Sequence, residues 1–120
     1  MEQTGRPLPQ RNAELRRYRR HETTRFAWLK TIVPRGATPV EGIGYCTDVA
    51  RGGCGIVTDT KLEVDDLLMV TIAFDRQHFV LSAACRVVFA KQRSDGSLQV
   101  GLEFAVLPPD AHGFLGRYFP

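Results

Sequence analysis

The fold is decided by residues 78–106, HFVLSAACRVVFAKQRSDGSLQVGLEFAV. Within it, residues 78–91 and 97–106 alternate between apolar and other side chains, which is the period of a β-strand with one buried face. The residues expected on that face are Phe79, Leu81, Ala83, Cys85, Val87 and Phe89 in the first strand, and Leu98, Val100, Leu102 and Phe104 in the second. Ser94-Asp95-Gly96 between the strands is a tight-turn signal, so the stretch predicts an antiparallel hairpin.

Four segments upstream of the hairpin also have the composition of strands. They cover residues 24–33, 40–49, 54–58 and 67–74, with turns such as Pro34-Arg35-Gly36 and Arg51-Gly52-Gly53 between them. The residues that share a face are Phe26, Trp28, Lys30 and Ile32 in the first segment, and Ile43, Tyr45, Thr47 and Val49 in the second. We expect Phe26, Trp28 and Tyr45 to belong to the core.

Six strands joined by short turns within about 85 residues predict an all-β fold, because closing a small sheet into an antiparallel barrel removes its exposed edges. Strand spacing leaves open whether the barrel is OB-like or SH3-like. Residues 108–118 open with two prolines and Asp110, which favours the start of a helix. Gly113 and Gly116 limit this helix to one or two turns, and we expect it to cover a mouth of the barrel.

The size and composition of the chain fit one soluble domain. It has 120 residues, of which 43% are apolar and 24% charged. Residues 1–13 hold Gly5, Pro7 and Pro9 among polar side chains and are expected to form a flexible leader, with the domain spanning 14–120. No stretch approaches the roughly 20 apolar residues of a membrane span, and no secretory signal opens the chain. We therefore expect a cytoplasmic protein.

The charge of the chain is concentrated at its beginning. Residues 1–25 hold seven arginines against three glutamates and carry +4, whereas the remainder holds nine basic and ten acidic residues and carries −1. A basic arm on a near-neutral body favours a phosphate-bearing partner, although charge alone fits a solubilising tail equally well.

The distribution of cysteine and histidine gives no sign of a metal or catalytic site. Cys46, Cys54 and Cys85 form no CxxC pair and the three histidines are scattered, so we expect buried free thiols and no metal. No Ser/His/Asp order, paired carboxylates or phosphate-binding loop is visible. We therefore do not expect an enzyme.

The first pattern that carries chemistry is Arg16-Arg17-Tyr18-Arg19-Arg20. A guanidinium group binds phosphate oxygens in a bidentate way, reads guanine O6 and N7, and stacks on bases. Arg16 and Arg20, four residues apart, are therefore suited to clamp an anionic guanine ligand. Taken alone, the pattern fits a solvated basic run better.

The second pattern is Asp48-Val49-Ala50-Arg51-Gly52-Gly53, at a strand end. The Asp48 carboxylate can accept hydrogen bonds from a guanine N1–H and N2–H₂ edge, and Gly53 permits close approach of a ligand to the backbone. Alone, it is also an ordinary turn. The joint presence of both patterns, with 27 residues between Arg20 and Asp48, favours a binding site.

Together these patterns resemble the PilZ domain, a small bacterial β-barrel marked by RxxxR before the first strand and [D/N]-x-S-x-x-G some 20–30 residues later. Cys54-Gly55-Ile56 and residues 100–104 (VGLEF) add to a resemblance that covers residues 14–119. The resemblance implies a six-stranded barrel that binds cyclic di-GMP as a second messenger in the control of motility or biofilm formation. It implies that Arg16 and Arg20 contact guanine and phosphate. It also implies that Asp48 and Gly53 contact a guanine edge and the sugar-phosphate. Auxiliary phosphate contacts are implied for Arg17, Arg19 and Arg51.

The motif serine is Ala50 in this chain, so one hydroxyl is missing. A neutral hydrogen bond contributes about 0.5–1.5 kcal/mol, which weakens binding roughly 2- to 13-fold. We therefore expect a cyclic di-GMP receptor, a monomer or homodimer, that passes its signal to an unidentified effector protein.

Two alternatives remain open. In the first, a degenerate PilZ-type protein does not bind the nucleotide and acts by protein–protein contact. In the second, a small basic barrel binds RNA or single-stranded DNA. The net charge of −1 on the body and the expected burial of the aromatic side chains disfavour nucleic acid.

Overall fold

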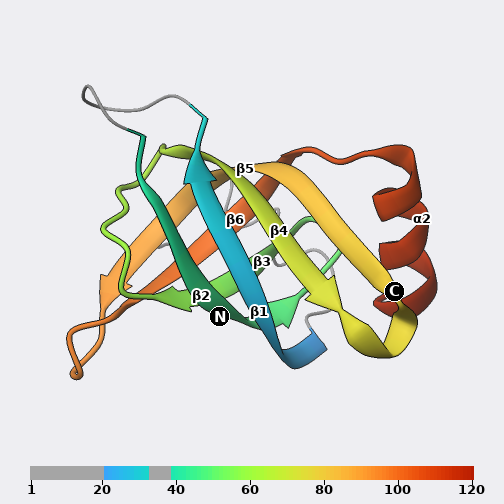
Figure 1. Ribbon diagram of the computed structural model, residues 1–120, viewed down its shortest axis with the longest axis horizontal. Coiled ribbons are helices and arrows are strands. Elements are labelled where there is room, and N and C mark those ends of the chain that lie inside the picture. Colours follow the sequence, from blue (N-terminus) through green and yellow to red (C-terminus); the bar gives the residue numbers. More distant parts are fainter. Residues whose placement is uncertain (1–20, 33–38) are drawn as a thin grey trace, which may run out of the picture.

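Residues 21–32 and 39–120 are described by the computed structural model, and they form a closed six-stranded antiparallel barrel with one helix (Figure 1). The strands are β1 (His21–Thr31), β2 (Glu41–Val49), β3 (Gly53–Thr58), β4 (Leu67–Phe74), β5 (Phe79–Gln92) and β6 (Leu98–Val106). The 3-10 turn η1 (Asp75–Gln77) joins β4 to β5, and the helix α2 (Pro109–Tyr118) follows β6. The order around the barrel is β1-β2-β3-β6-β5-β4, and pairing of β1 with β4 closes it.

Apolar side chains from all six strands fill the barrel. The fully buried residues include Ala27, Cys46, Ile56, Leu68, Val70, Ile72, Leu81, Cys85, Val87, Val100 and Leu102. They alternate along each strand with residues on the outer wall, as the period of two requires. The face predicted for β6 is confirmed by the burial of Val100 and Leu102, and the predicted hairpin turn is confirmed by Gly96, whose φ of +91° suits glycine.

The outward position of Phe26, Trp28 and Tyr45 shows that the prediction of their burial in the core was wrong. Trp28 is 47% exposed and Tyr45 is 53% exposed, while Ala27 and Leu29 of β1 point into the barrel. Alternation shows which residues share a face, but the narrow interior of a small barrel accepts the smaller set. Exposed aromatic side chains are therefore present, and only the net charge still argues against nucleic acid.

Of the register shifts between paired strands, two β-bulges change the face predicted for a side chain. The register of β2 against β3 shifts between Cys46 and Asp48, so Thr47 and Asp48 both lie on the outside and Val49 turns into the core. Val49 therefore does not share a face with Ile43, contrary to the sequence prediction.

The second bulge lies in β5, where the register against β6 shifts between Val87 and Phe89. Phe89 pairs with Gly101, and its phenyl ring lies so closely over this glycine that a Cβ there would clash with it. The prediction that Phe89 lies on the buried face was wrong for the same reason as for Val49. A bulge reverses the alternation beyond it, and nothing in the local sequence marks its place.

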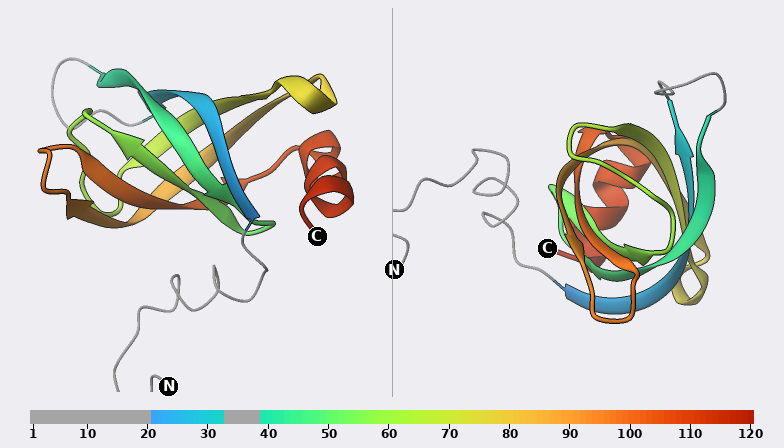
Figure 2. Two further views of the ribbon diagram at one scale, coloured as in Figure 1. Left: turned by 90° about the horizontal axis from the view of Figure 1, so that it is seen from below. Right: turned by 90° about the vertical axis from the view of Figure 1, so that its left-hand side faces the viewer.

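Helix α2 covers one end of the barrel, as the right-hand view of Figure 2 shows by looking along the barrel toward the helix. Phe114 stacks on Phe79 with ring centroids 4.2 Å apart and packs on Phe74 at 5.1 Å. The helix has ten residues, so the expected one or two turns were too few. Burial of Ala111, Phe114 and Leu115 holds a helix that its two glycines would disfavour in isolation.

Candidate functional site

A polar hollow of about 570 Å³ lies on the outer wall of the barrel, where β1, β2 and β6 contribute side chains. Its lining residues are Thr23, Thr24, Thr47, Asp48 and Gln99. The volume lies within the range of about 300–1,000 Å³ that is usual for small-molecule sites. The hollow therefore has room for a nucleotide-sized ligand and offers it hydroxyl, amide and carboxylate groups.

The bulge in β2 is what presents Asp48 to this hollow. Without the register shift after Cys46, strict alternation would place Thr47 and Asp48 on opposite faces of the strand. With it, both side chains line the same hollow. The backbone carbonyl of Asp48 also accepts a hydrogen bond from the Cys46 thiol at 3.3 Å, which ties the bulge to the core.

A glycine on the neighbouring strand makes room for the Asp48 carboxylate. Gly55 of β3 pairs with Asp48, and a Cβ on Gly55 would lie 2.9 Å from Oδ2 and 3.2 Å from Oδ1. Gly55 in turn pairs with Gly101 of β6, over which the Phe89 ring lies. On the outer wall, the Asp48 carboxylate thus lies over Gly55 and the Phe89 ring over Gly101, and these two glycines are paired on neighbouring strands.

The rest of the second sequence pattern forms the turn between β2 and β3. The Ala50 N–H donates to the Gly53 carbonyl at 2.8 Å, and the Phe104 N–H donates to Gly52 at 2.9 Å. Ala50 is only 4% exposed and Gly53 is buried, and neither lines the hollow. Both residues therefore lie in the turn that follows Asp48.

The exposed residue of this turn, Arg51, lies toward the C-terminal helix. A Cβ on Gly116 of α2 would come within 3.5 Å of its Nη2. Arg51 is not among the residues that line the hollow either.

The arginines of the first pattern, Arg16, Arg17, Arg19 and Arg20, lie outside the described residues. The strand that follows them begins at His21, which pairs with Val49 of β2, beside the bulge. The His21 imidazole Nε2 lies 3.1 Å from the Pro120 carbonyl oxygen, and its ring packs on Phe119 at 5.6 Å. The start of β1 is therefore anchored between the hollow and the end of the helix.

Sequence reasoning missed several residues of the site: Thr23, Thr24, Thr47, Gly55 and Gln99. Thr23 and Gln99 join Asp48 only through the pairing of strands that are distant in the sequence. Gly55 had a signal, because glycine inside a strand indicates a close approach.

The predicted free cysteines are confirmed. Cys46, Cys54 and Cys85 are all buried and form no disulfide. A side-chain hydrogen bond with Cys46, and burial, raise the pKa of Cys54, and burial raises the pKa of Cys85. Such thiols are poor nucleophiles, so they give the site no covalent chemistry.

Residues 21–32 and 39–120 contain no cluster of three or more side chains suited to a metal ion, and none of their helices is long and apolar enough to cross a bilayer.

The sequence model of the PilZ domain family matches residues 14–119. No match is found among curated protein sequences.

Several solved structures share the fold. The Bacillus subtilis inhibitor of motility MotI (DgrA) aligns with a TM-score of 0.68 at 14% identity, over 84% of this chain and 47% of that one. Escherichia coli YcgR in complex with c-di-GMP aligns with a TM-score of 0.66 at 15% identity, over 84% of this chain and 42% of that one. The PilZ domain of Escherichia coli YcgR with c-di-GMP aligns with a TM-score of 0.63 at 14% identity, over 84% of this chain and 86% of that one. This chain thus spans less than half the length of MotI and of YcgR.

Proposed function

This chain belongs to the PilZ domain family, and from that premise we propose that it binds cyclic di-GMP in the hollow beside Asp48. The single observation that carries the proposal is the position of Asp48. A bulge and a facing glycine present its carboxylate to a hollow of about 570 Å³, next to the strand that follows the arginine pair. His21, which follows the arginine pair in the sequence, pairs with Val49, the neighbour of Asp48.

The chemistry of guanine fits this surface. Its Watson–Crick edge offers N1–H and N2–H₂ donors, which a carboxylate such as Asp48 accepts. Its Hoogsteen edge offers the O6 and N7 acceptors, which match the donor fork of an arginine. We assign the first edge to Asp48 and the second, with the phosphates, to Arg16 and Arg20.

The remaining residues of the two patterns take supporting roles in this proposal. Arg17, Arg19 and Arg51 supply positive charge for the phosphates, which are dianionic in total. Gly53 and Ala50 close the turn that follows Asp48 and the end of β2. The YcgR PilZ domain, which has the same fold, was solved with c-di-GMP, and this supports the choice of ligand.

We propose that binding is a signal rather than a step in catalysis. Closure of the arginine arm over the outer wall would change the surface that an effector protein meets. The alternative function is protein–protein contact without nucleotide, and the alanine at position 50 is the observation that favours it.

The experiment that tests the position of the site is a nuclear magnetic resonance titration of the full chain with cyclic di-GMP. The amides of Thr23, Thr47, Asp48 and Gln99 should shift, while those of Thr71 and Ser82, on the outside of β4 and β5, should move little. Saturable shifts confined to another face would overturn the assignment. No shift at millimolar ligand would favour the alternative function.

A further inference from the structure

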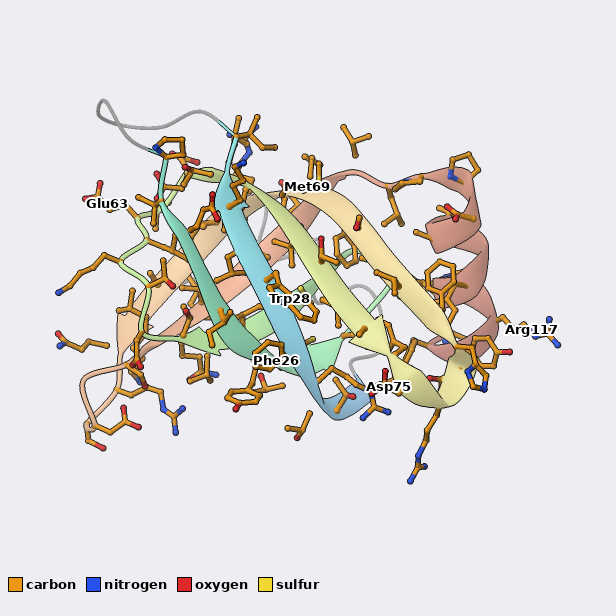
Figure 3. All side chains as sticks on the ribbon, in the orientation of Figure 1. Phe26, Trp28, Glu63, Met69, Asp75 and Arg117 are labelled. Atoms are coloured by element: carbon orange, nitrogen blue, oxygen red, sulfur yellow. The ribbon has the colours of Figure 1, made fainter. Side chains whose placement is uncertain are left out.

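A continuous apolar surface covers the outside of β1, β2 and β4. We call it the aromatic face, and it consists of Phe26, Trp28, Ile43, Tyr45 and Met69. Phe26 lies edge-to-face against Trp28 at 4.9 Å and against Tyr45 at 5.7 Å, so the three rings form one row. Figure 3 shows Phe26, Trp28 and Met69 on the side of the barrel turned toward the viewer. Such a patch on a soluble domain marks a binding surface.

A second hollow, of about 250 Å³, adjoins the aromatic face. Ile43, Tyr45 and Val57 give it apolar lining, and Asp59 and Asp95 add two carboxylates. Asp95 accepts hydrogen bonds from the Ser97 hydroxyl at 2.6 Å and the Ser97 N–H at 3.0 Å, and these bonds lower its pKa. The hollow therefore suits an apolar stem with a cationic head.

The extent of the aromatic face argues against a second copy of the chain as its occupant. Trp28, Ile43, Tyr45 and Met69 are about half exposed, so at ~150–250 Å² each these four side chains offer roughly 300–500 Å² in total. A stable protein dimer needs about 800 Å² on each partner. The face is better matched to a short peptide segment.

Proline-rich segments bind to aromatic-lined grooves, and the two carboxylates beside this aromatic row would attract a basic residue in such a segment. This chain has such a segment in Arg6-Pro7-Leu8-Pro9-Gln10-Arg11. The two prolines favour the extended polyproline II conformation, which loses little entropy on docking. The arginines supply the cations, and Leu8 supplies an apolar side chain.

The segment is also within reach of the face. His21 pairs with Val49 of β2, and Ile43 at the second hollow lies six residues along β2 from Val49, a distance of about 20 Å. The second hollow also reaches Val57 of β3, two strand spacings or about 10 Å to the side of β1. Residues 12–20 between Arg11 and His21 span about 30 Å when extended. Residues 12–20 are therefore long enough for residues 6–11 to reach the hollow.

We propose that residues 6–11 dock on the aromatic face of their own chain, with an arginine at Asp59 and Asp95 and the prolines on Trp28 and Tyr45. The proposal is independent of nucleotide binding. It assigns the segment as an intramolecular ligand that hides an apolar surface from other proteins.

Trp28 is the only tryptophan of the sequence and lies within the aromatic face, so its fluorescence in the full chain reports directly whether residues 6–11 are docked there. The double variant Arg6→Glu/Arg11→Glu should raise the acrylamide quenching constant of Trp28 about two-fold over the wild type. Arg6→Lys/Arg11→Lys should stay near the wild type. The matched control is Arg76→Glu/Arg117→Glu, which changes the charge equally on exposed arginines at the helix end of the barrel (Arg117 in Figure 3) and should leave quenching unchanged.

A spin label on Thr4→Cys gives a second readout. The native cysteines are at most 2% exposed, so the introduced thiol reacts selectively. The label should broaden the amide signals of Tyr45 and Asp59, and Arg6→Glu/Arg11→Glu should restore them. Equal quenching in the wild type and the Glu variant, together with unbroadened signals, would overturn the proposal. Quenching that falls with protein concentration would also overturn it, since a second copy would then be the occupant.

Discussion

The carboxylate of Asp48 lies directly over Gly55 of the neighbouring strand, so closely that a Cβ at position 55 would come within 2.9 Å of Oδ2. Asp48 reaches this position because the bulge in β2 turns it outward beside Thr47. The carboxylate is thus held on the outer wall by the backbone of two strands.

Replacing Gly55 with alanine should move Asp48 and weaken nucleotide binding. The added methyl group displaces the carboxylate from β3, and we expect at least a ten-fold loss of affinity for cyclic di-GMP in calorimetry. The matched control is Gly113→Ala, because a Cβ there meets nothing within 4 Å and only improves helix propensity. Unchanged affinity in Gly55→Ala would show that the position of Asp48 does not matter for binding.

Removing the charge of Asp48 should weaken binding more than removing a neutral group would. Asp48→Asn keeps the size and one acceptor oxygen, but it loses the charge-assisted hydrogen bonds to guanine. A bond to a charged group contributes about 1.5–3 kcal/mol, so affinity should fall about 10- to 150-fold. Calorimetric titration with cyclic di-GMP measures the loss of affinity. A second variant, Gln99→Glu in the same hollow, tests whether extra negative charge simply repels the ligand.

Restoring the motif serine should maintain or improve affinity. A hydroxyl at position 50 contributes about 0.5–1.5 kcal/mol where it finds a partner, so Ala50→Ser should bind up to about 13-fold more tightly. Because Ala50 is 4% exposed, thermal unfolding should accompany the titration: an unpaired buried hydroxyl costs about 1–3 kcal/mol. A large loss of affinity with unchanged stability would mean that the motif has been misplaced.

The buried thiols predict how stability depends on pH. The pKa values of Cys54 and Cys85 are raised above 9.0, so the folded state keeps protons that the unfolded chain releases. Their contribution to stability is complete below pH 9 and is lost as the pH rises further. The free energy of unfolding in urea should therefore fall above pH 9 by up to about 1.4 kcal/mol per pH unit for each thiol. Cys85→Ala should flatten this slope, and an unchanged slope would contradict the assignment.

The strands of this barrel could be predicted because apolar alternation is a local property. Residues 67–74 were predicted with the bounds of β4, and the hairpin at Gly96 follows from its turn residues. The alternation could not show that Trp28 and Tyr45 face outward, because it fixes which residues share a face and not which face is inside. The length of α2 was underestimated because packing of Phe114 on Phe79 stabilises it.

The candidate site could be predicted only where its residues lie in sequence patterns. Asp48 was found in this way, and it lines the hollow. Thr23 and Gln99 could not be found, because they meet it through strand pairing. The bulge that turns Asp48 outward follows from the register of β2 against β3, which is a property of the assembled barrel.

The most direct test of the central claim is calorimetric titration of the full chain with cyclic di-GMP, with GTP as control, at two salt concentrations. We expect saturable heat with cyclic di-GMP alone, weaker binding at high salt because phosphate contacts are screened, and a stoichiometry that reports one or two bound nucleotides. Arg16→Ala/Arg20→Ala should abolish the heat and leave thermal unfolding of the barrel unchanged. Wild-type affinity in that double variant, or no heat from the wild type at high micromolar ligand, would contradict the account.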